Sequence, residues 1–95
     1  MLMTLIELQQ EIIANRIRRN WSSATDLLKT TGGIAEELGE FEHARRNNNR
    51  EEMIDALADI AIFVLGGFEI LGASAHPIIN TIVLKNKNRV GQTDH

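Results

Sequence analysis

Residues 36–68 read EELGEFEHARRNNNREEMIDALADIAIFVLGGF, and this stretch decides the fold of the chain. Apolar residues recur at helical spacing on both sides of a short polar segment, residues 46–50, which contains three consecutive asparagines. A segment of this kind typically joins antiparallel helices. The stretch therefore predicts a helical hairpin, and its second helix, from about residue 51 to residue 71, begins acidic and ends apolar.

The rest of the chain is also predicted to be helical. Of its 95 residues, 43% are hydrophobic but only 4% are aromatic, and there is a single proline, which favours an all-α protein over a β-sandwich. Gly72 is expected to end the hairpin. We expect the other helices over residues 3–19, from Ser23 or Thr25 to Arg46 with a kink or a new start at Gly32 and Gly33, and from Ser74 to about Asn86.

The bulk properties restrict the class of protein. No repeat or linker divides the sequence, so we expect one domain over residues 1–95, with 91–95 as a frayed tail. A net charge of -3 gives no overall attraction for nucleic-acid phosphates. The absence of cysteine excludes disulfides and suits the cytoplasm. The longest apolar run is shorter than the roughly 20 residues that cross a bilayer, so we expect a soluble, cytoplasmic protein with no membrane partner.

Asp59 is the most informative residue of the second hairpin helix. It lies in a stretch, residues 56–68, that is otherwise apolar or glycine. A buried carboxylate needs a cation, a hydrogen-bond network or a metal. Glu52, Asp55 and Asp59 share a wedge of about 60° on a helix, and the same line continues into apolar residues. A solvent-facing acidic stripe is the simpler alternative, but we expect a helix buried nearly all round with its acids turned inward.

The first hairpin helix carries three more acids, Glu36, Glu37 and Glu40. If the two helices pair, Glu37 and Glu40 can face Asp55 and Asp59. Converging carboxylates would repel one another and remain partly protonated without a cation. An all-oxygen cluster prefers Mg²⁺ or Mn²⁺ over zinc or copper. The pattern therefore predicts a divalent metal site.

Glu40 and His43 also form Glu-x-x-His, which is half of the signature of di-iron helical bundles. The other half is absent, because no histidine lies near Asp55 or Asp59. His43 is therefore expected at the surface.

Two further features could serve a phosphorylated ligand. Trp21 is the only tryptophan and could stack on a base, although packing is the commoner role. Lys29 and the arginines at positions 16–19 could reach phosphates, but a solvated helix end explains the arginines equally well, so we leave them out of the primary site. A basic run near the C-terminus could bind phosphate, or its cations could complement the C-terminal end of a helix. The residues of this run are Lys85, Lys87, Asn88 and Arg89.

The sequence resembles the MazG-like all-α nucleotide pyrophosphohydrolases. The likeness covers about residues 20 to 90 and comprises E-E-x-x-E at 36–40, an acidic motif on the next helix, and the basic and asparagine-rich run at 85–89. The resemblance implies a four-helix bundle completed by oligomerisation, as a homodimer or homotetramer. It also implies Mg²⁺-dependent hydrolysis of a nucleoside triphosphate to the monophosphate and pyrophosphate.

Carried over by motif, Glu37 and Glu40 match metal ligands of the first helix, and Asp59 matches the aspartate of the second. The chain departs from the pattern at Ala56, where a glutamate is expected. Asp55, one turn from Asp59, is our predicted replacement. The predicted site comprises Glu36, Glu37 and Glu40 as catalytic residues; Glu37, Glu40, Asp55 and Asp59 as metal ligands, with Glu52 in reserve; the C-terminal run at phosphates; and Trp21 at the base.

The expected function is hydrolysis of surplus or non-standard deoxynucleoside triphosphates. Within the same superfamily, the alternatives are a phosphoribosyl-ATP pyrophosphohydrolase or a pyrimidine-specific dCTPase or dUTPase. A different class of protein also stays open, namely a non-catalytic helical oligomerisation module whose acids only pair with Arg16, Arg45 or Arg50.

Overall fold

The computed structural model describes residues 2–21 and 25–89, and within these ranges it contains helices and no strand. The all-α prediction is confirmed. Ser23 and the predicted tail, residues 91–95, lie outside the described residues. The helices are α1 (Leu5–Arg18), α2 (Leu27–Arg46), α3 (Arg50–Ile70) and α4 (Ala75–Lys87).

Local signals explain most helix ends. Thr4 accepts a hydrogen bond from the Glu7 amide and the Glu7 side chain returns one, which is a capping box at the start of α1. Asp26 caps α2, so the prediction of Thr25 for this role is wrong. Gly72 follows α3 with φ at +71°, the left-handed conformation that glycine adopts without strain, as predicted.

The predicted new start at Gly32 and Gly33 is wrong, because α2 continues through both residues as one helix. The alternative, a kink at this point, stays a prediction. Gly33 has a packing role. A Cβ placed there would lie 2.3 Å from Cζ of Phe63 on α3. The missing side chain therefore lets the phenyl ring approach the backbone of α2.

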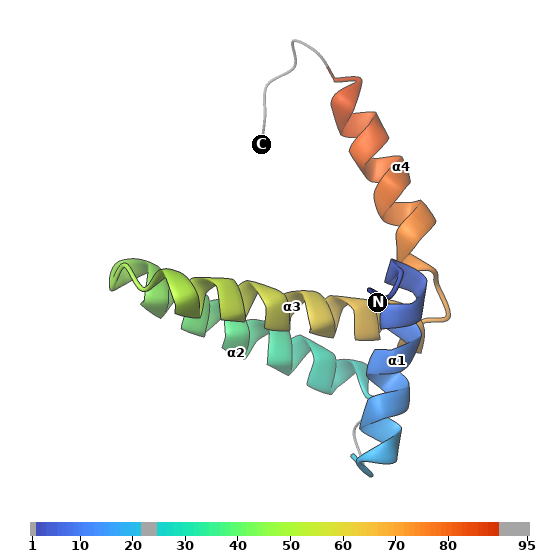
Figure 1. Ribbon diagram of the computed structural model, residues 1–95, viewed down its shortest axis with the longest axis horizontal. Coiled ribbons are helices and arrows are strands. Elements are labelled where there is room, and N and C mark those ends of the chain that lie inside the picture. Colours follow the sequence, from blue (N-terminus) through green and yellow to red (C-terminus); the bar gives the residue numbers. More distant parts are fainter. Residues whose placement is uncertain (1, 22–24, 90–95) are drawn as a thin grey trace.

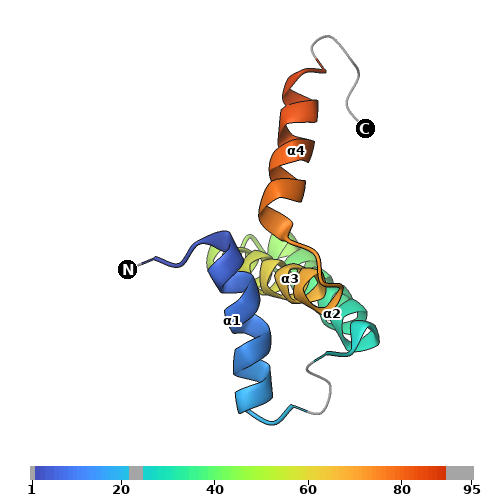
Figure 2. The same cartoon turned by 90° about the vertical axis from the view of Figure 1, so that its right-hand side faces the viewer.

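Helices α2 and α3 form the predicted antiparallel hairpin, and α1 packs across the end of α3 that is remote from the hairpin loop (Figure 1). Helix α4 points away from the hairpin, and among the described helices it packs mainly against α1 (Figure 2). No single described helix is long and apolar enough to cross a membrane. Helices α3 and α4 pass that test only as a pair, and they are bent by 115°.

The core of the single chain is thin. Its buried apolar residues are small or few, and no large side chain of the described residues is fully buried. Leu57 on α3 and Val83 on α4 are more than half exposed, and Asp59 is exposed as well. The expectation that α3 is buried nearly all round, with its acids turned inward, is therefore wrong for the isolated chain. The physical reason is that α2 covers one face of α3 and α1 only one end.

One buried polar residue fixes the corner between α3 and α4. The side chain of Gln9 on α1 donates hydrogen bonds to the Ala73 carbonyl, at 2.7 Å, and to the Glu69 carboxylate, at 2.9 Å. Its oxygen accepts from the amide of Ala75 at 2.9 Å. Ser74 makes no side-chain cap, so Gln9 supplies the N-terminal cap of α4 from another helix.

Candidate functional site

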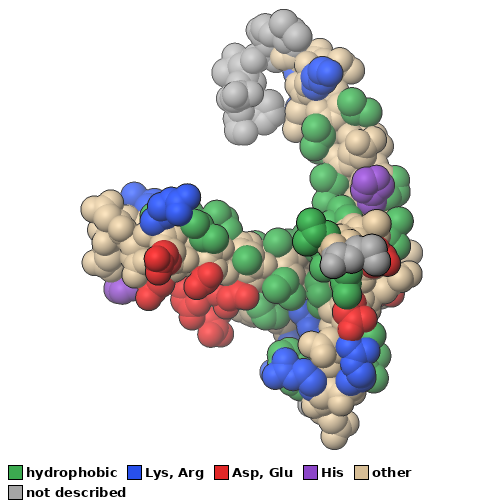
Figure 3. All heavy atoms as spheres, viewed as in Figure 1, with side chains coloured by type: hydrophobic (Ala, Val, Ile, Leu, Met, Phe, Trp, Pro, Cys, Tyr) green, Lys and Arg blue, Asp and Glu red, His purple; other side chains and the backbone are tan. Residues whose placement is uncertain are grey.

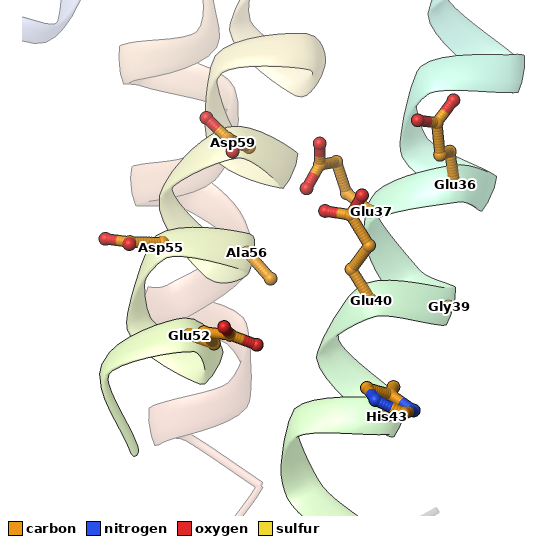
Figure 4. Close-up of a pocket in the computed structure, with 9 residues that line it drawn as sticks. All are labelled: Glu36, Glu37, Gly39, Glu40, His43, Glu52, Asp55, Ala56 and Asp59. Carbon is orange, nitrogen blue, oxygen red and sulfur yellow. The ribbon is translucent and has the colours of Figure 1, made fainter. Parts of the chain in front are cut away.

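An open cavity of about 620 Å³ lies between α2 and α3, and we call it the acidic cleft (Figure 4). The hairpin brings all six predicted carboxylates of these helices to its walls. Figure 3 shows the acidic side chains gathered on one side of the hairpin. Helix α1 projects toward the same side and carries cations of its own. The lining residues are Glu36, Glu37, Gly39, Glu40 and His43 from α2, and Glu52, Asp55, Ala56 and Asp59 from α3.

The side chains of the cleft differ in direction (Figure 4). Glu37 and Glu40 extend from α2 toward α3, and Glu52 extends from α3 toward α2, whereas Asp55 points away from α2. Ala56 faces Glu40, so the position where the motif expects a glutamate does belong to the cleft. Glu52 therefore has the better direction for the replacement ligand, while our choice of Asp55 stays a prediction.

Glu37 shows that these carboxylates interact. A hydrogen bond with the Glu40 side chain, then burial, then the negative charges of Glu40, Asp59 and Glu36 raise the pKa of Glu37 to about 7. Its Oε1 atom is buried and has no hydrogen-bond partner in the described structure. An acceptor oxygen left without a donor is costly, and a cation beside it would remove that cost.

The cleft has the donor set of a hard divalent ion but not its geometry. Among residues 2–21 and 25–89, no three acidic or histidine side chains are placed to hold one metal together. The donors are nevertheless all oxygens, the type that Mg²⁺ and Mn²⁺ prefer. With the buried oxygen of Glu37, the residues present fit such an ion. Glu37, Glu40, Asp59 and Glu52 could bind it by side-chain rotation.

A second cavity of about 410 Å³, here called the aromatic cavity, adjoins the acidic cleft because Glu37 and Asp59 line both. Trp21 lines this cavity, and the guanidinium of Arg19 lies 4.8 Å from the centre of the Trp21 ring. The structure thus places the predicted base-binding residue beside the acids. The remaining lining residues are Ile12, Asn15 and Arg16 from α1, Arg19 directly after α1, and Ile62 and Phe63 from α3.

Arg16 was not predicted to belong to the primary site, but it lies in the wall of the aromatic cavity. Its side chain is only 8% exposed, so it is not part of a solvated helix end. Helical spacing carried the signal, because Arg16 follows the buried residues Gln9 and Ile13 by seven and three positions. Arg16 therefore belongs to the inward face of α1.

The predicted phosphate-binding run is not brought to the cleft within one chain. Its residues are exposed and lie in the last turn of α4 and directly after it, at the end of the helix that projects away from the hairpin (Figure 2). Their role stays a prediction that needs a second chain. His43 is exposed, as expected, and contacts Asn47 rather than an acid. The residues of the run are Lys85, Lys87, Asn88 and Arg89.

The family model described as Phosphoribosyl-ATP pyrophosphohydrolase matches residues 4–86, which is most of the chain. No curated protein and no solved structure matches it significantly.

Proposed function

Since the chain belongs to the phosphoribosyl-ATP pyrophosphohydrolase family of the MazG-like superfamily, it is a hydrolase of acid anhydrides, and we propose that its substrate is a nucleoside triphosphate. The superfamily resemblance read from the acidic motifs is thereby confirmed. In the proposed reaction, water cleaves the bond between the α- and β-phosphates and leaves a nucleoside monophosphate and pyrophosphate.

The observation that carries this proposal is the continuity of the two cavities. Glu37 and Asp59 line both the acidic cleft and the aromatic cavity. A nucleoside triphosphate has the matching layout, with a flat base at one end and a metal-binding polyphosphate at the other. We place the base against Trp21 and the phosphates along the acidic cleft.

We further propose that Mg²⁺ or Mn²⁺ occupies the acidic cleft, held by Glu37, Glu40 and Asp59 with Glu52 or Asp55 in place of the absent glutamate. The ion would neutralise phosphate oxygens and make the attacking water more acidic. The protein's own part is to position the groups and accept a proton. A carboxylate that the ion leaves free, Glu36 or Glu40, would take the proton of the attacking water.

For the substrate, we propose deoxynucleoside triphosphates, with removal of surplus or non-standard ones as the role. Phosphoribosyl-ATP is the second candidate, because the matching family is described by that substrate. It shares the triphosphate and a purine base, so the same two cavities would receive it.

We also propose that the chain acts as a homodimer or homotetramer. Apolar side chains on α4 and on one face of α3 are exposed, among them Leu57, Ile82 and Val83. Burying such surface is the main driving force of association. A second copy would also supply the basic run at 85–89 that the single chain keeps far from its own acids.

The test is product analysis with the purified protein and Mg²⁺. Pyrophosphate release is measured from the four dNTPs, dUTP and phosphoribosyl-ATP side by side. We expect Asp59→Ala or Glu37→Ala to abolish release, and Glu51→Ala to leave it intact because Glu51 lies on α3 outside the cleft. No turnover on any of these nucleotides would favour the non-catalytic module instead.

A further inference from the structure

Arg16 is a buried cation whose position is fixed by α3. Its guanidinium carbon lies 5.4 Å from the centre of the Phe63 ring. It also packs against the backbone at Gly66, where a Cβ would lie 2.8 Å from Nη1 of Arg16. The guanidinium is thus packed between α1 and α3, against the Phe63 ring and the backbone at Gly66.

Among the residues that the structure describes, no anion is paired with this cation. The ion pairs of the described residues are made by Arg18, Arg45 and Arg46, all of them exposed. Arg16 makes no ion pair and donates no side-chain hydrogen bond within residues 2–21 and 25–89. Burial lowers the pKa of Arg16. A buried charge without a partner is costly, so the site favours an anion that comes from outside the chain.

The position of Arg16 indicates which anion. It lines the aromatic cavity together with Trp21, and the same cavity ends at Glu37 and Asp59. In a nucleotide, the α-phosphate lies between the sugar and the two outer phosphates. A guanidinium binds phosphate oxygens through two parallel hydrogen bonds, which suits a fixed arginine at this point.

Resting on the proposed function, we infer that Arg16 binds the α-phosphate, the one that stays on the nucleoside after hydrolysis. Arg16 is a binding residue in this role and takes no part in proton transfer. The alternative is that Arg16 only packs between α1 and α3. That alternative predicts an effect on stability but none on the recognition of phosphate.

The test measures binding in EDTA, so that neither metal nor turnover contributes. Calorimetry compares four deoxynucleoside monophosphates, dAMP, dCMP, dGMP and dTMP, with the corresponding nucleosides. We expect the wild type to prefer a monophosphate over its nucleoside by roughly tenfold or more, the range for a hydrogen bond to a charged group. Arg16→Gln should remove that preference and leave nucleoside affinity unchanged.

Two variants control the experiment. Arg18→Gln removes an exposed arginine of the same helix and should keep the full preference. If Arg16→Gln does not fold, Arg16→Lys retains the charge without the planar fork and should keep only part of the preference. A wild type without preference, or a preference that survives in Arg16→Gln, would overturn the inference.

The pyrophosphate assay on the wild type separates this inference from the proposed activity. If the wild type releases pyrophosphate while Arg16→Gln retains the monophosphate preference, only the inference fails. If the wild type releases none but the preference depends on Arg16, the inference stands and the activity fails.

Discussion

Metal binding to the acidic cleft should depend steeply on pH, because a proton and a metal ion compete for Glu37. The pKa of Glu37 is raised to about 7 by the Glu40 side chain and by burial. With that value, about 10% of Glu37 is protonated at pH 8 and about 90% at pH 6. Since Glu37 must be deprotonated to bind the metal, the apparent affinity for Mg²⁺ should fall about tenfold from pH 8 to pH 6.

The assay is a Mg²⁺ titration of the nucleotide-free protein at pH 6, 7 and 8, followed by the rise in melting temperature. Glu37→Gln is the matched variant, because it keeps the shape of the side chain and removes the titrating group. It should bind Mg²⁺ more weakly and lose most of the pH dependence. An affinity of the wild type that is constant from pH 6 to pH 8 would refute the role of Glu37 as a ligand.

Three further predictions concern the free protein and are checked by urea denaturation. Because the raised pKa favours neutral Glu37 in the folded state, the stabilisation that this group contributes is fully present below about pH 4.5 and is lost as the pH rises through about 7. Glu37→Gln should flatten this decline of stability with pH. Gln9→Ala should cost roughly 1–3 kcal/mol, since it leaves the amide that begins α4 without a partner. Gly33→Ala should cost roughly 1–3 kcal/mol through overlap with Phe63, whereas Gly32→Ala, which meets nothing, should stabilise by up to about 1 kcal/mol. A stability that does not change with pH, a Gln9→Ala variant as stable as the wild type, or equal effects of the two glycine variants on stability would contradict these assignments.

The hairpin and its acids were predictable from the sequence because they depend on local signals. Helical spacing, the asparagine loop and Gly72 act within a few residues, and α2 and α3 form where the pattern placed them. Once two helices pair antiparallel, the acids that flank the loop lie across from one another. The acidic cleft follows from that geometry.

The rest depended on contacts between distant residues. Gly33 suggested a break in α2, but its reason is Phe63, thirty positions further along the chain. Arg16 is buried in the same way against Gly66, a contact that the sequence did not reveal, so a solvated helix end explained the arginine equally well. The burial predicted for Asp59 was wrong for a related reason. A continuous apolar run suggests a helix covered by neighbouring helices on all sides, and a single hairpin cannot provide that cover.

The direction of α4 was equally hidden from the sequence. It is set by the hydrogen bonds of Gln9 to the corner between α3 and α4, which join residues 60 to 66 positions apart. As a result, the basic run at 85–89 ends far from the acids that the motif pattern associates with it.

The central claim is cleavage between the α- and β-phosphates, and phosphorus NMR of the reaction products tests it most directly. Wild-type protein with Mg²⁺ and the best dNTP of the panel should yield a monophosphate and pyrophosphate in equal amounts. Formation of a diphosphate and orthophosphate, or no turnover of any nucleotide in the panel, would contradict the account.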